Sequence, residues 1–218
     1  MMKSPIIWVA AWVLGYAALQ AACADLPLTR SQALAQTSSA DAKQRRIAVD
    51  RLGQVGLMSD ARVLLKALHD RDEITRALSE ASIWRVWSRS GDAKVDELFE
   101  RGMREMNVGA LESAIETFTS VIRNKPDFAE GWNKRATLYF LTGDLAKSLK
   151  DCDEVLRRNP SHFGALAGYG QIYIQLDQPE RALDYFQRAL RINPNMQGVA
   201  QSIEVLKQYV GRRRDRVI

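Results

Sequence analysis

Residues 126–160 read PDFAEGWNKRATLYFLTGDLAKSLKDCDEVLRRNP, and the prolines that bound this stretch belong to a regular series. Pro126, Pro160 and Pro194 follow one another at intervals of 34 residues. The same interval relates Gly102, Ala136 and Gly170; Ala114, Ser148 and Ala182; Phe118, Cys152 and Phe186; and Val121, Val155 and Ala189. A period of this length is typical of a helical hairpin that stacks against further copies of itself.

The residue types in each set indicate how one hairpin is built. Small residues at positions 102, 136 and 170 predict that the first helix of a pair closely approaches the second. Gly109 and Gly143 are expected to end a first helix in the left-handed conformation, which costs glycine little. Each proline of the series follows a second helix and prevents it from continuing.

This pattern resembles the tetratricopeptide repeat family over residues 95–196. The second and third repeats match best, through Trp132, Tyr139, Gly143 and Pro160, and through Gly170, Tyr173, Ala182, Phe186 and Pro194. The first repeat departs from the pattern, with Arg101 and Glu105 where apolar and aromatic residues are usual. The resemblance implies an all-α solenoid with repeats over 95–128, 129–162 and 163–196. A capping helix is expected over 197–210, with Val199, Ile203, Leu206 and Val210 at helical spacing, before a basic tail over 211–218.

The segment before the repeats divides into a leader and a helical part. Residues 25–40 are polar and aperiodic and predict a mobile leader. Residues 41–92 predict helices, two of them capped by Asp60 and Asp72. The last should bury one face formed by Ile74, Ala77, Leu78, Ala81, Trp84 and Trp87. This part resembles one and a half HEAT repeats, and a helical hairpin that caps the array is the alternative. We expect Trp84 and Trp87 to pack against the first repeat's helix around Leu98.

The first 24 residues have the pattern of a secretory signal peptide. Lys3 supplies a positive charge, residues 5–19 are uncharged and apolar, and residues 22–24 read Ala-Cys-Ala before Asp25. The sequence therefore predicts export to the periplasm. An uncleaved anchor over residues 6–24 is one alternative. A lipoprotein modified at Cys23 is another, although Gln20 stands where such signals usually carry leucine.

No pattern in the chain indicates catalysis, a metal or a cofactor. The two histidines, His69 and His162, have no spacing to other ligands that suggests a metal site, and His162 is expected to cap a helix. Cys152 should be a buried, unreactive thiol. We find no nucleophile elbow, phosphate-binding loop or zinc signature. The formal charge of +5 is only mildly basic, and together with export it argues against a nucleic-acid partner.

The resemblance implies a concave groove lined by the first helix of each repeat. Its predicted residues are Asp96, Phe99, Met103 and Met106; Glu130, Asn133, Thr137 and Phe140; and Gly164, Ala167, Gln171 and Ile174. Either these side chains bind an extended protein segment, or Phe99 and Phe140 are covered by neighbouring repeats or by the N-terminal helices. Chaperone-adaptor members of the family bind a C-terminal carboxylate with basic residues on the third repeat. Gly164 and Ala167 stand there instead, which argues against that mode.

Two functional hypotheses follow. The chain resembles small exported repeat proteins of Gram-negative bacteria, which implies a periplasmic scaffold that binds an envelope or secretion protein and supports envelope integrity. The alternative is a structural protein whose basic tail over residues 211–216 contacts an anionic membrane surface.

Overall fold

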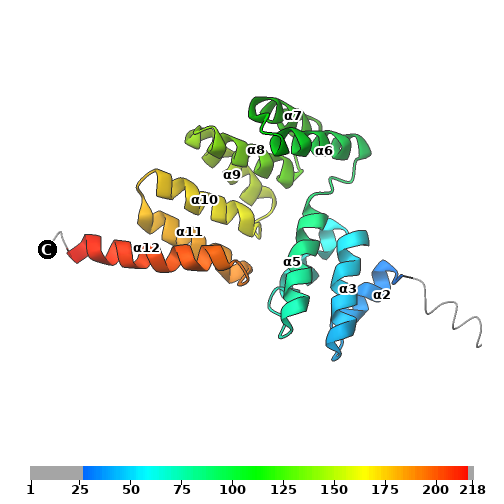
Figure 1. The fold of residues 1–218 in the computed structure, drawn as a ribbon. Helices are drawn as coiled ribbons and strands as arrows, with labels where there is room; N and C mark the ends of the chain where they lie inside the picture. The colour runs from blue at the N-terminus through cyan, green and yellow to red at the C-terminus, as the bar shows by residue number, and fades with distance from the viewer. Residues whose placement is uncertain (1–26, 216–218) are drawn as a thin grey trace, which may run out of the picture.

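A computed structural model describes residues 27–215 of the 218-residue chain, and the elements in that range are helices. They are α2 (Arg30–Gln36), α3 (Ala42–Val55), the short 3-10 helix η1 (Met58–Asp60), α4 (Ala61–Ala67), α5 (Glu73–Trp87), α6 (Ala93–Asn107), α7 (Leu111–Asn124), α8 (Ala129–Leu141), α9 (Leu145–Arg158), α10 (Phe163–Gln175), α11 (Pro179–Ile192) and α12 (Gln197–Asp215) (Figure 1). The predicted all-α class is confirmed. The predicted signal peptide and its alternatives lie outside the described residues.

Three hairpins, α6–α7, α8–α9 and α10–α11, stack in chain order and are followed by α12 (Figure 1). The turn inside each hairpin uses the left-handed backbone conformation at equivalent positions. Gly109 has φ 77°, Gly143 has φ 81°, and Asp177 takes the same position in the third hairpin with φ 50°. The prediction that glycine ends the first helix is confirmed for two hairpins. In the third, aspartate tolerates a conformation that most side chains avoid.

Glycine inside the first helices allows each hairpin to close tightly. A Cβ atom at Gly102 would lie 2.8 Å from the ring of Phe118, and one at Gly170 would lie 2.4 Å from the ring of Phe186. Both rings are fully buried. In the second hairpin the Ser148 hydroxyl instead donates to the Ala136 carbonyl oxygen at 2.7 Å. The small residues of the 34-residue sets therefore make contacts within each hairpin, as predicted. The rings of Phe118 and Phe186, which we expected to fill the gap between adjacent hairpins, instead pack against the glycine of their own hairpin.

Helix α12 covers the end of the array and is longer than predicted. Ile203, Leu206 and Val210 are buried, as the helical spacing indicated. The helix then continues to Asp215, because Gly211 does not adopt the left-handed conformation that ends α6 and α8. The predicted boundary between capping helix and tail at residue 210 is thus corrected. Arg213, placed in the tail, lies on the helix and contacts Asp177 at 3.3 Å.

The N-terminal segment, α2 to α5, contains more structure than the sequence indicated. Within the predicted mobile leader, residues 30–36 form α2, which begins with a capping box between Thr29 and Gln32. Ala33 is fully buried against α3, and Arg30 makes an ion pair with Asp60. So short a helix is marginal on its own, and its stability comes from contacts with residues distant in sequence. The periodicity of neighbouring residues therefore did not predict α2.

Helix α5 buries a different face from the predicted one. Asp72 caps it as expected, by accepting from the Thr75 amide. Asp60 is the residue before α4, but its carboxylate makes no cap there and instead binds Arg30 and the Leu57 amide at the start of η1. Ile74, Ala77 and Ala81 are exposed. The buried face instead carries the small polar residues Thr75, Ser79 and Ser82 together with Ile83, Val86 and Trp87. Small side chains let α5 approach α3 and α4 closely. The buried Ser79 hydroxyl donates a hydrogen bond to the Leu64 carbonyl oxygen.

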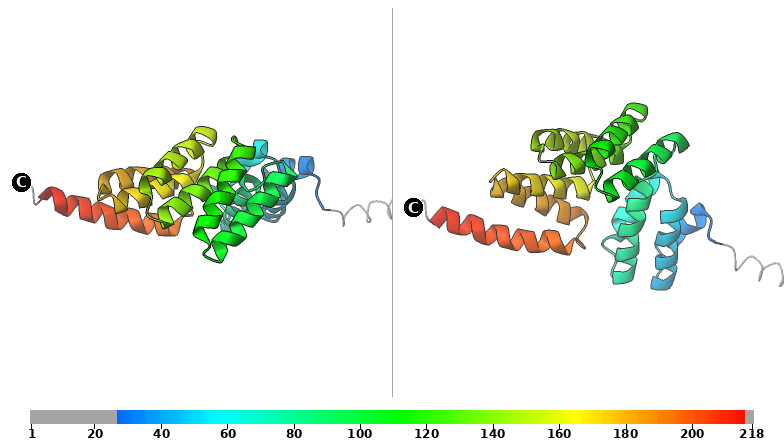
Figure 2. Two further views of the ribbon diagram at one scale, coloured as in Figure 1. Left: turned by 90° about the horizontal axis from the view of Figure 1, so that it is seen from above. Right: turned by 45° about the horizontal axis from the view of Figure 1, so that its top comes forward.

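The N-terminal segment folds back onto the far end of the repeat array. Trp84 and Trp87 were expected against the helix around Leu98, but they contact His162 and Phe163 at the start of α10. A second contact lies beside it, where the Asn195 side chain donates to the Leu68 carbonyl and accepts from Arg76. The segment therefore bridges α6, to which it is joined, and the α11–α12 connection (Figure 2).

Candidate binding groove

The predicted groove residues nearest the N-terminus of the array belong to its core. Phe99 is 5% exposed and packs edge-on against Phe118 and Phe128, with ring centroids 5.5 and 5.4 Å away. Met103 and Met106 are half-buried against the same cluster. Asp96 is half-buried, and its carboxylate accepts a hydrogen bond from the Ser90 amide. Phe99 is thus corrected from a binding residue to a core residue, because its ring fills the space between α6, α7 and the next hairpin.

A buried polar cluster occupies the next part of the concave side. Glu130 is 1% exposed, and its carboxylate lies 2.9 Å from His162 Nε2 and 3.0 Å from Lys134 Nζ. Asn133 is also buried and donates to the same carboxylate. The prediction that Glu130 faces a ligand is therefore wrong, whereas Asn133, although buried, lines the cavity between α8 and α10. Their polar atoms satisfy one another, as buried polar groups require.

His162 orients this cluster and also caps α10, as predicted. Its Nδ1 accepts the Ala165 amide hydrogen at 3.0 Å. The proton of a neutral ring must then be on Nε2, which donates to Glu130. Burial alone would raise the pKa of the Glu130 carboxyl, but the hydrogen bond from His162 and the charge and hydrogen bond of Lys134 outweigh it. The net result is a lowered pKa.

Two tryptophans of α5 cover the polar cluster. The Trp87 ring stacks on His162 with centroids 4.5 Å apart, and Trp84 lies edge-on to the same imidazole at 5.6 Å. Lys134 Nζ is 5.7 Å from the centroid of Trp84. Gly164 makes room for this arrangement, because a Cβ atom there would lie 2.6 Å from Trp84. Helix α5 thus occupies the concave side beside the N-terminal ends of α8 and α10.

Replacing Glu130 by glutamine is expected to flatten the acid side of the stability profile. With its pKa lowered in the fold, ionised Glu130 stabilises the protein above the unfolded pKa of about 4.3. That contribution is lost as the pH falls through the lower folded value. Glu130→Gln should be less stable than wild type near neutrality and lose less stability on acidification, measured by urea unfolding across the acid range. Glu112→Gln, at an exposed position, is the control. Parallel profiles for wild type and Glu130→Gln would contradict the prediction.

The part of the groove that α5 leaves uncovered contains two cavities between successive first helices. The first, about 270 Å³, lies between α8 and α10 and is lined by Thr137, Phe140, Gly168 and Gln171 among others. Phe140 is half-buried there and Gln171 is exposed. Ala167, also predicted to face the groove, is half-buried against the adjacent core. Thr137, Phe140 and Gln171 thus lie together where the repeat register placed them.

The second cavity, about 550 Å³, lies between α10 and α12 and is lined mainly by apolar side chains. The large apolar side chains exposed in this cavity are Ile174, Val205 and Tyr209, which are 41%, 66% and 44% exposed. Val205 follows Gln171 by 34 residues, so α12 presents the same register to the groove as the first helices before it. The sequence analysis treated α12 only as a cap, so it did not predict that the cavity is lined by Val205, Tyr209 and Arg212. Extending the 34-residue register one step further would have found Val205.

The thiol of Cys152 offers no reactive centre. It is buried, and burial together with the charges of Asp151 and Asp153 raises its pKa to about 12. The two carboxylates point apart, since Asp151 pairs with Arg135 at 2.7 Å whereas Asp153 accepts a hydrogen bond from Tyr169. The prediction of an unreactive thiol is confirmed. Within residues 27–215, no three His, Cys, Asp or Glu side chains gather in a way that could hold a metal ion, and no helix there has the length and apolar character needed to cross a membrane.

Helical hairpins that stack in chain order define an α-solenoid. The sequence profile of the tetratricopeptide repeat matches residues 127–195. A TPR repeat-containing protein of Rhizobium etli is 30% identical over 150 residues, which are 69% of this chain and 72% of the relative. The chain therefore belongs to the tetratricopeptide repeat family, whose domains are interaction scaffolds rather than catalysts.

Other similar proteins have lower sequence identity. Hsp70-Hsp90 organizing protein 1 of Glycine max is 21% identical over 68% of this chain, which spans only 25% of that protein. The first TPR of Spaghetti (RPAP3), solved with an HSP90 peptide, has a TM-score of 0.53 at 23% identity and covers 55% of this chain and 96% of that one. The Sgt2 TPR domain from Aspergillus fumigatus has a TM-score of 0.54 at 17% identity, over 57% and 83% of the two chains. These structures are similar in fold.

Proposed function

We propose that the protein is a non-catalytic scaffold that binds a peptide segment or helix of a partner protein in the uncovered half of its concave groove. The observation that carries the proposal is the cavity between α10 and α12, in which Ile174, Val205 and Tyr209 expose apolar side chains. Exposed apolar groups of this kind, gathered in one cavity, are typical of binding sites. The half covered by Trp84 and Trp87 is structural.

The geometry defines the kind of segment that fits. Two cavities between α8, α10 and α12 succeed each other along the groove, so a helix or extended segment can place one apolar side chain in each. Gln171 lies beside Ile174 and can hydrogen-bond the backbone of the bound segment. No basic pair lies at the third repeat's groove positions, where Gly164 and Ala167 stand, so the bound segment is held by its side chains rather than by a terminal carboxylate.

We place this activity in the periplasm, with an envelope or secretion protein as the partner and support of envelope integrity as its role. The support for export is the signal-peptide pattern of residues 1–24. Contact of the basic tail with an anionic membrane surface stays a second hypothesis. Arg213 is already engaged with Asp177, so binding of the tail to lipid has to compete with that ion pair.

Arginine in the apolar groove is expected to abolish partner capture. A photo-crosslinking residue placed at Gln201, which lines the second cavity, should form an adduct with the partner in the periplasmic fraction of the cell. Ile174→Arg should remove the adduct and, once the partner is purified, raise its Kd by about 30-fold, the loss of an interface anchor worth about 2 kcal/mol. Val108→Arg, at an exposed apolar position on the α6–α7 connection, is the matched control.

The two parts of the proposal fail in different ways. An adduct that forms equally well in Ile174→Arg would exclude the groove as the binding site. Adducts found in the cytoplasm alone would instead contradict export, and a purified protein that does not begin at Asp25 would contradict the predicted cleavage site. Both results leave the groove assignment unaffected.

A further inference from the structure

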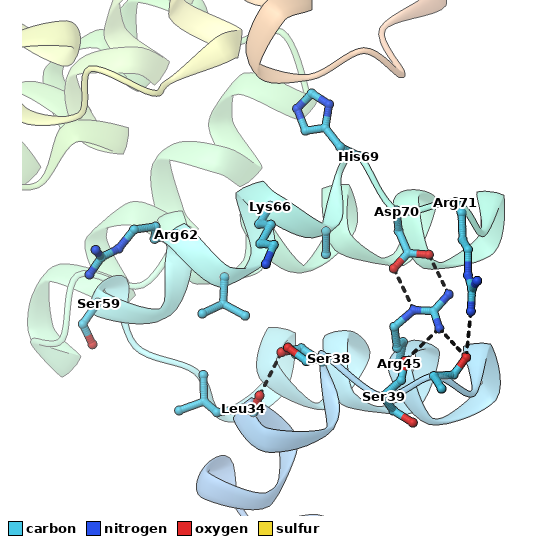
Figure 3. Close-up of a pocket in the computed structure, with 14 residues that line it drawn as sticks. Leu34, Ser38, Ser39, Arg45, Ser59, Arg62, Lys66, His69, Asp70 and Arg71 are labelled. Atoms are coloured by element: carbon cyan, nitrogen blue, oxygen red, sulfur yellow. Dashed lines mark hydrogen bonds and ion pairs between the residues drawn. The ribbon is translucent and has the colours of Figure 1, made fainter.

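A further cavity lies outside the repeat array, in the N-terminal segment. It has a volume of about 870 Å³ and lies between α4 and the connection from α2 to α3 (Figure 3). Its apolar floor is formed by Leu34, Val63 and Ala67. The repeat register does not extend to these residues, and the proposed groove function makes no use of them. We refer to this cavity as the N-terminal cleft.

The charged side chains that line the N-terminal cleft are predominantly cationic. Arg45, Arg62, Lys66 and Arg71 line it, and Asp70 is the one carboxylate among the lining residues. Asp70 is neutralised by Arg45, which binds it through two nitrogens at 2.7 and 2.8 Å. Among the side chains that the structure describes, Arg62, Lys66 and Arg71 have no carboxylate within 4.0 Å. Three cations therefore face the cleft without a counter-charge from the protein.

These cations are spread along the N-terminal cleft rather than gathered at one point. Arg62 lies near Ser59 at one end, Lys66 points from α4 into the space between the walls, and Arg71 lies at the opposite end (Figure 3). Arg62 and Lys66 are four residues apart on α4, about 6 Å along the helix axis. A single small anion cannot reach all three, whereas an extended chain with several carboxylates can.

One wall of the N-terminal cleft is fixed before any ligand arrives. Arg45 is buried and donates to the carbonyl oxygens of Ser39 and Ala40 at 2.9 and 3.0 Å. Arg71 donates to the Ala40 carbonyl as well, at 2.9 Å, which leaves its other guanidinium donors available. A connection held in this way loses little conformational freedom on binding, and preorganisation of this kind favours affinity.

We propose that the N-terminal cleft binds an extended acidic peptide segment of a partner protein, with carboxylates at Arg62, Lys66 and Arg71 and an apolar side chain on the floor of Leu34 and Val63. Charge complementarity selects an anionic ligand, and the apolar floor selects one with apolar side chains between its charges. A membrane surface fits the cleft poorly, because Lys66 points into a recess and a flat bilayer contacts protruding groups. This second interaction surface is independent of the repeat groove.

Charge reversal in the cleft tests the proposal. A fluorescein-labelled peptide of alternating Glu and Leu is titrated with the full-length protein, followed by fluorescence anisotropy, beside the same peptide with Gln for Glu. We expect the Glu peptide to bind. The double substitution Arg62→Glu and Lys66→Glu should lower the affinity for this peptide by about tenfold. The matched control reverses the charges of Lys94 and Arg123, two exposed cations on α6 and α7, and so makes the same change in net charge. It should change the affinity by less than about twofold. Circular dichroism reports whether the exposed substitutions preserve the fold, and Lys66→Gln alone provides a milder variant.

Several results would overturn the proposal. Equal weakening in the cleft variant and in the control would mean that the peptide senses net charge alone. Equal binding of the Glu and Gln peptides would mean that the cations take no part. Binding of vesicles that contain anionic phospholipid, lost in the cleft variant while the Glu peptide shows no binding, would assign the cleft to a membrane surface. Displacement of the peptide by inorganic phosphate at equal concentration would mean that the cleft binds a single small anion rather than a peptide.

Discussion

Trp87→Ala is expected to lower the free energy of unfolding by about 3–5 kcal/mol, the range for removing a buried aromatic side chain. Trp87 is nearly inaccessible, stacks on His162, and packs in one cluster with Leu52 and Phe163. Its removal leaves a cavity where the N-terminal segment meets the third hairpin. We therefore expect the two parts to separate before the repeats unfold, with two transitions in place of one during chemical denaturation.

Limited proteolysis of the connection between α5 and α6 measures this separation directly. In wild type, Arg89 donates to the carbonyl oxygens of Gly53 and Gly56, and the Ser90 amide donates to Asp96, which holds the connection in place. Trp87→Ala should make it a preferred cleavage site. Trp132→Ala is the control, because Trp132 lies on the second repeat, stacked on Arg158 and bonded to the Pro126 carbonyl. A Trp87→Ala protein that unfolds in one transition at wild-type stability would refute the assigned contact.

Gly170→Ala and Gly168→Ala are expected to change stability in opposite directions, although both lie in α10. A methyl group at Gly170 would overlap the buried Phe186 ring, and overpacking of this kind costs about 1–3 kcal/mol. At Gly168 the nearest atom to a new Cβ is the Cys152 sulfur at 3.8 Å, an ordinary contact. There alanine should stabilise the helix by about 0.5–1 kcal/mol, because it loses less backbone entropy than glycine.

The comparison needs only urea titrations of the two variants and wild type. A further variant separates steric overlap from other effects: Phe186→Leu should cost less in the Gly170→Ala background than in wild type, because the smaller side chain relieves the overlap. Should both alanine variants stabilise the protein, or should the costs of Gly170→Ala and Phe186→Leu simply add, the close approach of α10 and α11 would not limit the packing of this hairpin.

The arrangement of α5 changes how the groove of this chain should be regarded. Phe99 and Glu130 occupy positions that the resemblance assigns to ligand contacts, yet they are covered by their neighbours or by Trp84 and Trp87. Exposed apolar side chains are instead found toward α10 and α12, at Ile174, Val205 and Tyr209. The N-terminal segment acts as a fixed partner of the array, and it brings its own cationic cleft to the same molecule.

The structure of the repeat array could be predicted from the sequence because its contacts recur. Gly102 and Phe118 recur as Gly170 and Phe186, and the turns recur at Gly109 and Gly143. Each of these contacts lies within one hairpin, so its residues are separated by a short and constant number of positions. A contact that recurs at constant spacing leaves a period in the sequence, and the period determined the fold class, the hairpins and the general course of the groove.

Only the tertiary structure decided which half of that groove is open. The contacts of Trp87 with His162, and of Leu68 with Asn195, join residues that are far apart in the chain and occur once. The buried face of α5 and the short helix α2 depend on the same kind of contact. A single contact between distant residues has no period and no local pattern, because its energy comes from packing that exists only once the chain has folded.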